Sequence, residues 1–110
     1  MAERSYIPDW REVVAYSKPG PMPHLLVDEP GLRVLVAGLE PGGRIPPHAA
    51  PRAVYHALEG DGVINLDGVL LPFGEGAIVV APDGASRGIE ATTRLAFLAV
   101  RIGTEAGSGA

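Results

Sequence analysis

The 110-residue chain contains no cysteine, one tryptophan and two phenylalanines. The absence of cysteine excludes disulfides and thiol chemistry, as is typical of proteins in a reducing compartment. The apolar run near the end, residues 95–100, is far too short to span a bilayer. The first residues, MAERSYIPDWREVV, carry charges where a signal peptide has an apolar core. We therefore expect a soluble cytoplasmic protein.

A basic excess is also missing, because the formal net charge is -4. A negative net charge gives no indication of a surface that binds nucleic acid or an anionic membrane. The chain is 46% hydrophobic and 20% charged, as folded domains are, and its length fits a single domain.

Glycine and proline, by contrast, are plentiful, with 15 and 11 residues spread along the chain. They separate short apolar segments that we predict to be strands: residues 24–27, 32–39, 54–59, 62–66, 69–71, 76–81, 86–91 and 94–102. Asp67-Gly68 is a strong two-residue hairpin signal, and residues 28–31 carry proline and glycine in type II turn order. No later segment shows a sustained helical period. We predict an all-β antiparallel sandwich or barrel over residues 24–102.

The two ends differ from this pattern. Residues 1–23 read as an N-terminal arm with one helical turn within residues 9–15, capped by Asp9. Tyr6, Trp10 and Tyr16 make the arm too apolar to float free, so we expect it to pack across a second subunit of a homodimer or on the barrel end. Residues 103–110 read as a flexible tail of small residues.

Two phrases of the chain resemble the two motifs of the cupin family. In the first, Gly42 is followed by five residues and His48, and Gly60 stands at the motif's closing glycine. In the second, Gly76, Pro82 and Gly84 match the family spacing without a gap. The resemblance covers residues 32–102 and implies a small antiparallel double-stranded β-helix, the cupin or jelly-roll barrel.

The resemblance also implies where a metal would sit in this family, and here most of those positions are replaced. His48 fills the first ligand position, but Ala50, Ala53 and Arg87 fill the other three. A divalent metal needs about three protein ligands, and neither alanine nor a cationic guanidinium supplies one. We expect no metal and no other cofactor.

A different ligand set is the alternative, in which His24, His48 and His56 converge on a metal. Strand alternation bears on this, because an inward Ala53 places Tyr55 and Ala57 inward and His56 outward. The reverse facing stays open, since the spacer before Ala53 is shorter than the family's.

Arg87 has two readings. At an inward ligand position it would turn a cation site into an anion site, offering a planar fork to a carboxylate. It could equally point to solvent at the rim or pair with Glu90 or Asp83. Arg44 and Arg52 could add to such a site, although solvated turns suit them better.

We predict a small-molecule-binding protein whose ligand-binding residues are His48, Tyr55 and Arg87. The expected ligand is a small organic acid or a phenolate with an apolar body. The alternatives are a metal-dependent cupin enzyme (a dioxygenase, isomerase or cyclase) that uses His48, and a structural or sensing protein without a ligand. The sequence assigns no catalytic residue.

Overall fold

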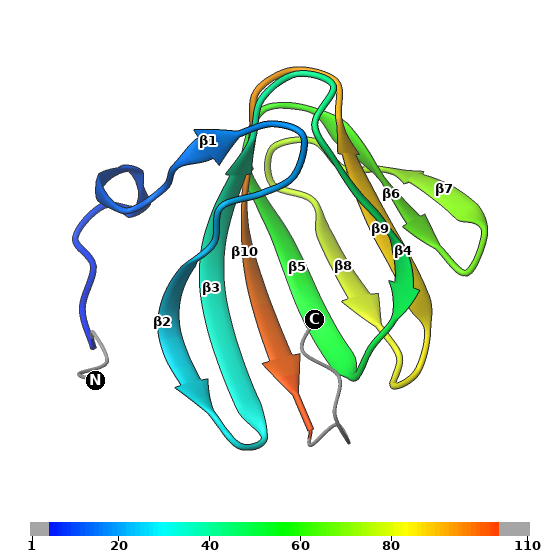
Figure 1. Cartoon of the computed structure of the whole chain (residues 1–110), viewed down its shortest axis with the longest axis horizontal. Helices are drawn as coiled ribbons and strands as arrows, with labels where there is room; N and C mark the ends of the chain where they lie inside the picture. The colour runs from blue at the N-terminus through cyan, green and yellow to red at the C-terminus, as the bar shows by residue number, and fades with distance from the viewer. Residues whose placement is uncertain (1–4, 104–110) are drawn as a thin grey trace.

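The computed structural model describes residues 5–103, and residues 104–110 of the predicted tail lie outside the described part. Two sheets face each other and enclose the core (Figure 1), and their described strand pairs are antiparallel except for the short parallel pair of β1 with β3. The larger sheet runs in the order β1-β3-β10-β5-β8, with β2 also paired to β3, and the smaller sheet in the order β4-β9-β6-β7. The larger sheet consists of β1 (Tyr16–Ser17), β2 (His24–Glu29), β3 (Leu32–Leu39), β5 (Arg52–Glu59), β8 (Ile78–Ala81) and β10 (Leu95–Ile102). The smaller sheet consists of β4 (Arg44–Ala49), β6 (Gly62–Leu66), β7 (Val69–Pro72) and β9 (Ser86–Ala91).

The core fills one part of the space between the sheets. Its largest fully buried apolar side chains are Leu39, Ile64, Phe73, Leu95 and Phe97. The Phe73 and Phe97 rings meet edge to face with centroids 6.3 Å apart, a geometry that aromatic pairs prefer. This packing leaves the opposite end of the barrel, beyond Phe97, to the cavity described below.

The predicted strands match the structure closely. β3, β6 and β9 have the predicted bounds. At the predicted hairpin, Asp67 and Gly68 have φ of 49° and 87°, as the two central residues of a type I′ turn require. The all-β prediction is confirmed.

Two strands escaped prediction, β1 in the arm and β4. The β4 sequence carries Pro46 and Pro47, which cannot donate to a ladder and so argue against a strand. In the structure the strand tolerates them because they form a bulge opposite Gly88, between the register pairs Ile45–Ile89 and His48–Arg87.

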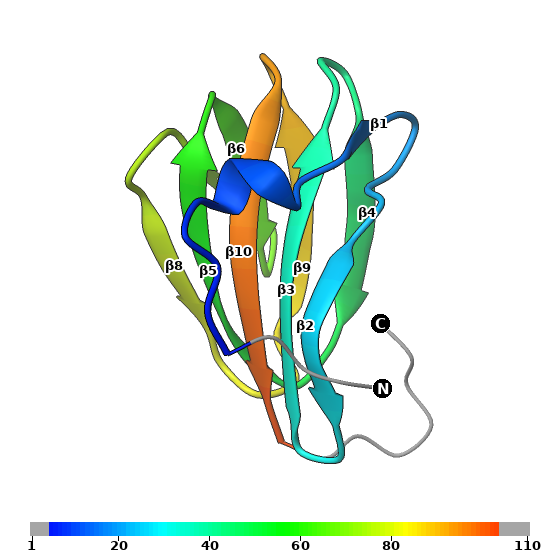
Figure 2. The ribbon, with the colours of Figure 1, turned by 90° about the vertical axis from the view of Figure 1, so that its left-hand side faces the viewer.

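The arm packs on its own barrel. The predicted helical turn is a 3-10 helix, η1 (Trp10–Glu12), capped by the Asp9 side chain. Figure 2 shows it crossing the outer face of the larger sheet, where Trp10 lines a cleft with Leu26 and Leu98. Trp10 thus has a place without a second subunit, whereas Tyr6 is 74% exposed. The homodimer stays a prediction.

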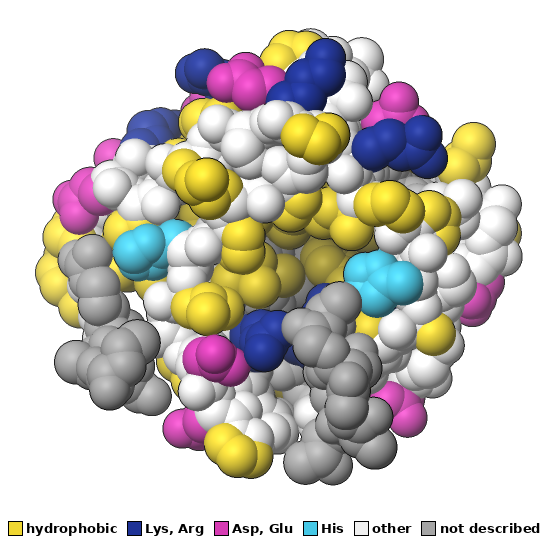
Figure 3. Space-filling view, viewed as in Figure 1, with side chains coloured by type: hydrophobic (Ala, Val, Ile, Leu, Met, Phe, Trp, Pro, Cys, Tyr) yellow, Lys and Arg dark blue, Asp and Glu magenta, His cyan; other side chains and the backbone are white. Residues whose placement is uncertain are grey.

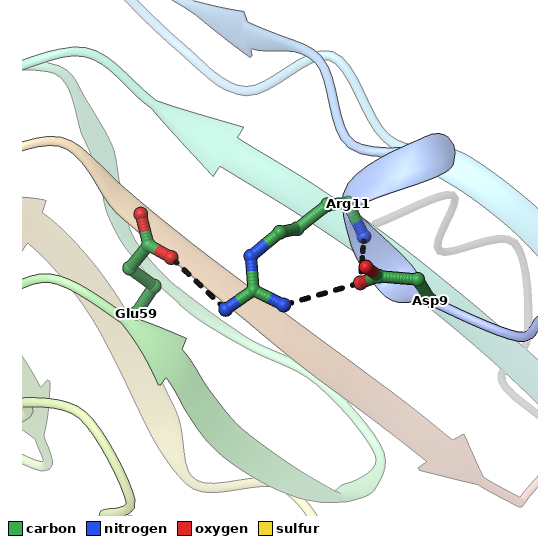
Figure 4. Close-up of polar contacts among 3 residues, drawn as sticks. All are labelled: Asp9, Arg11 and Glu59. Carbon is green, nitrogen blue, oxygen red and sulfur yellow. Dashed lines mark hydrogen bonds and ion pairs between the residues drawn. The ribbon is translucent and has the colours of Figure 1, made fainter.

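An ion-pair chain holds the arm to the sheet. Arg11 lies 3.2 Å from the Asp9 carboxylate and 3.5 Å from that of Glu59 at the end of β5 (Figure 4). The Arg11 backbone N–H also donates to Asp9 and lowers the pKa of its carboxyl group below the ordinary value. These pairs are exposed, so each contributes little stability by itself.

Candidate ligand-binding cavity

A cavity of about 250 Å³ lies between the two sheets. All three predicted ligand-binding residues, His48, Tyr55 and Arg87, line it. Most of the remaining wall is apolar: Leu35, Ala37, Ile45, Ile89, Phe97 and Ala99. In the space-filling view of Figure 3, hydrophobic side chains surround a hollow, with basic and histidine side chains at its edge.

The β4 bulge points His48 into this cavity. Ile45 faces the cavity, and strict alternation would turn a residue three positions later to the outside. Pro46 and Pro47 together oppose the single residue Gly88, so the facing shifts by one position. Gly88 permits this because a Cβ there would lie 2.8 Å from the Ile45 carbonyl oxygen. Both Ile45 and His48 therefore line the cavity.

The His48 imidazole is fixed at one nitrogen and unpartnered at the other. Its Nδ1 lies 3.2 Å from the Pro46 carbonyl oxygen, which can only accept, so Nδ1 carries the proton. Its Nε2 is buried and has no hydrogen-bond partner among residues 5–103. In the neutral ring Nε2 is an acceptor that lacks a donor. Such a group costs about 1–3 kcal/mol when it stays unpaired.

The other histidines lie elsewhere. Along β5, Ala53, Tyr55 and Ala57 are buried, and His56 between them is half-buried on the other face. Of the two facings that the sequence left open, the structure has the one with Ala53 inward. His24 pairs in register with Val36, which faces the arm side of the sheet. The three histidines therefore do not converge in the structure.

Arg87 is the most deeply buried polar side chain among the described residues, with 1% of its surface exposed. Its guanidinium donates from Nε to the Ala85 carbonyl at 2.8 Å and from Nη1 to the Pro51 carbonyl at 2.8 Å. Nη2 donates to the Ala50 and Pro82 carbonyls at 3.0 and 3.1 Å. A longer contact of 3.4 Å joins Nη1 to the Tyr55 hydroxyl oxygen. All five N–H groups of the side chain are therefore engaged.

This arrangement matches neither reading of Arg87 in full. The side chain is not at a solvated rim, and its partners are carbonyl oxygens rather than Glu90 or Asp83. Its fork is also not open to a ligand. Instead it ties the link between β4 and β5 to the turn between β8 and β9. Arg87 therefore contributes its charge to the cavity. Tyr55 contributes its hydroxyl proton, which it donates to no other described residue.

Two further arginines line the cavity, Arg33 on β3 and Arg101 on β10. Sequence reasoning missed both and considered Arg44 and Arg52 instead, which are exposed and do not line the cavity. One signal was available, because alternation from the buried Phe97 and Ala99 turns Arg101 inward. No Asp or Glu belongs to the described lining.

Comparison with known proteins identifies the fold. No family model matches the chain, and no curated protein matches it either. Solved structures do. A conserved protein of unknown function from Streptococcus pyogenes is 25% identical with a TM-score of 0.83, over 96% of this chain and 93% of that one. This chain has the cupin fold.

Two other solved structures agree with this assignment. An uncharacterised protein with a double-stranded β-helix domain from Klebsiella pneumoniae is 22% identical with a TM-score of 0.82, over 94% of this chain and 95% of that one. An RmlC-like cupin from Desulfovibrio desulfuricans is 21% identical with a TM-score of 0.73, over 93% and 96%. No described helix of this protein is long and apolar enough to cross a membrane.

The cupin fold raises the question of a metal, and the residues present do not fit one. At the family's ligand positions only His48 offers a donor atom, since Ala50 and Ala53 are buried alanines. Arg87 fills the remaining position with a cation whose donors bond the backbone. Within residues 5–103, no group of three or more His, Cys, Asp or Glu side chains is placed to hold an ion.

Proposed function

We propose that this cupin binds a small organic acid with an apolar body in its cavity, without a metal ion. The observation that carries the proposal is the charge of the lining. Three of the nine basic residues of the chain, Arg33, Arg87 and Arg101, line one cavity, although the whole protein has a net charge of -4. Arg33 has the Asp28 carboxylate at 3.3 Å, but no carboxylate belongs to the described lining, so a negatively charged ligand is the natural counterion for Arg87 and Arg101.

Each part of the cavity suits part of such a ligand. The apolar wall accepts a hydrocarbon body. Tyr55 can donate its hydroxyl proton, since it accepts rather than donates in its contact with Arg87. The buried charge of Arg87 favours an anion even without a direct hydrogen bond, because water does not screen it.

The alternative of a metal-dependent enzyme has little support. It needs ligands besides His48, and the nearest family positions hold alanine and an arginine that is already bonded. A structural role without a ligand would leave the His48 Nε2 without a donor among residues 5–103.

A thermal-shift experiment on the untagged full-length chain tests the proposal. We would use benzoate and 4-hydroxybenzoate against their neutral amides at equal concentrations. The acids should raise the melting temperature and the amides should raise it much less. Arg44→Gln is the control, because Arg44 is exposed and lies outside the cavity, and it should respond as the natural protein does. Equal shifts with acids and amides, or no shift with either, would refute the proposal.

A further inference from the structure

Two arginines of the cavity stand directly opposite each other on neighbouring strands. Arg101 on β10 is the register partner of Arg33 on β3, and both side chains line the cavity. Like charges directly opposite in an antiparallel pair are destabilising, since their Cβ atoms lie about 4.5–5.5 Å apart. The pair therefore costs stability in the free protein.

Of these two arginines, only Arg33 has a carboxylate nearby among residues 5–103 that offsets its charge. Arg33 has the carboxylate of Asp28, its register partner on β2, at 3.3 Å from Nε. Arg101 has Ala53 as its partner on its other side, on β5. Arg101 makes no hydrogen bond or ion pair with any of residues 5–103. It is half-buried, so solvent only partly relieves its charge.

Arg87 cannot bind the carboxylate of a ligand through its own N–H groups. Its five N–H groups already bond the chain, so a carboxylate entering the cavity finds no free fork there. The guanidinium of Arg101 is engaged by none of residues 5–103, and a bidentate pair with a carboxylate is the geometry that this group prefers.

We propose that Arg101, with Arg33 beside it, holds the ligand's carboxylate, and that the ligand's other end carries a hydroxyl that reaches His48 and Tyr55. This inference rests on the proposed function and specifies the ligand as a hydroxy acid. Tyr55 pairs with Ala99, two residues before Arg101, so the two ends lie roughly 7 Å apart along the strands. A flat six-membered ring separates a carboxylate and a hydroxyl by a comparable length.

The hydroxyl group on the ligand is inferred from the unpaired acceptor nitrogen of His48. Nε2 of His48 is buried without a donor among the described residues, and Nδ1 keeps the proton on its bond to Pro46. A hydroxyl of the ligand supplies the missing donor to Nε2 and can accept from Tyr55 through its own oxygen.

The test is calorimetric titration of full-length protein with 4-hydroxybenzoate, benzoate and 4-hydroxybenzamide. Arg101→Gln should weaken binding of both acids about ten-fold or more, since it removes a charge-assisted pair, and should leave the amide's affinity unchanged. The control Arg44→Gln should change none of them. Without ligand, the melting temperature of the Arg101→Gln protein should also be no lower than that of the natural protein, because the substitution removes a like-charge contact.

The outcomes separate this inference from the proposed function. If the natural protein binds the acids and Arg101→Gln binds them equally well, the carboxylate lies elsewhere and only this inference falls. If the natural protein binds no acid, both fall. The hydroxyl assignment predicts that 4-hydroxybenzoate binds more tightly than benzoate and that His48→Ala removes the difference. A preference that persists in His48→Ala overturns that assignment.

Discussion

Replacing Arg87 with methionine tests whether the guanidinium is a structural tie. Methionine has a similar length and is apolar, so it fills the space but donates no hydrogen bond. Of the four carbonyl oxygens that Arg87 bonds, those of Ala50 and Pro82 each keep a backbone donor, Gly84 and Ala85 respectively. The carbonyls of Pro51 and Ala85, both buried residues outside the strands, have no other partner among the described residues.

The expected cost follows from those two carbonyls. An unpaired buried acceptor costs about 1–3 kcal/mol, and removal of a buried charge gives back part of this sum because its desolvation penalty disappears. We expect Arg87→Met to lower the free energy of unfolding by about 2–4 kcal/mol, which a domain with about 5–15 kcal/mol of stability survives.

Urea unfolding followed by circular dichroism measures this change. Arg44→Met is the matched control, because Arg44 is exposed and its side chain makes no hydrogen bond or ion pair within residues 5–103, and it should stay within about 0.5 kcal/mol of the natural protein. Arg87→Lys should fall between the two, since an ammonium can satisfy some of the carbonyls but not in a planar fork. An Arg87→Met protein as stable as the natural one would refute the structural role.

Three further predictions concern the bulge, the arm and the metal. Gly88→Ala forces the β4 bulge to move, so it should cost about 1–3 kcal/mol in the same assay and weaken acid binding through His48; unchanged stability and binding would contradict the bulge argument. The pKa of Asp9 is lowered in the folded protein, so its contribution to holding the arm is complete above the ordinary carboxyl pKa and is lost as pH falls through the lowered value. The fluorescence emission of Trp10, the only tryptophan, should therefore shift as the pH falls below about 4. The Asp9→Ala protein should show that shift already at neutral pH. Identical emission spectra for this variant and the natural protein at neutral pH would exclude the role of the cap. Elemental analysis of untagged protein should find far less than one divalent metal per chain, and a stoichiometric metal lost in His48→Ala would restore the enzyme alternative.

Local sequence signals were sufficient for most of the barrel. β3 and β6 are continuous apolar or alternating segments between turn residues, so their bounds follow from the pattern alone. β4 was hidden, because Pro46 and Pro47 are strand breakers unless a residue without a side chain faces them. That residue, Gly88, comes 41 positions after Pro47 in the sequence, and only the folded register shows the match.

The candidate site, too, could be predicted only in part from the sequence. Alternation along β5 left two facings open, and the structure has the one that turns Tyr55 inward. The motif spacing brought His48 and Arg87 to the same cavity. The partners of Arg87 are carbonyl oxygens, which leave no trace in a sequence. The opposition of Arg33 and Arg101 depends on how β3 and β10 pair across a long stretch of chain, and no local pattern sets that register.

The most direct test of the central claim is to titrate the untagged protein with 4-hydroxybenzoate before and after treatment with a chelator. The claim is that arginines, and not a metal ion, provide the positive charge that binds the acid in this cavity. The account predicts the same affinity and the same stoichiometry in both titrations, with no change when a divalent metal is added back. Binding that disappears after chelation and returns with the metal would contradict it.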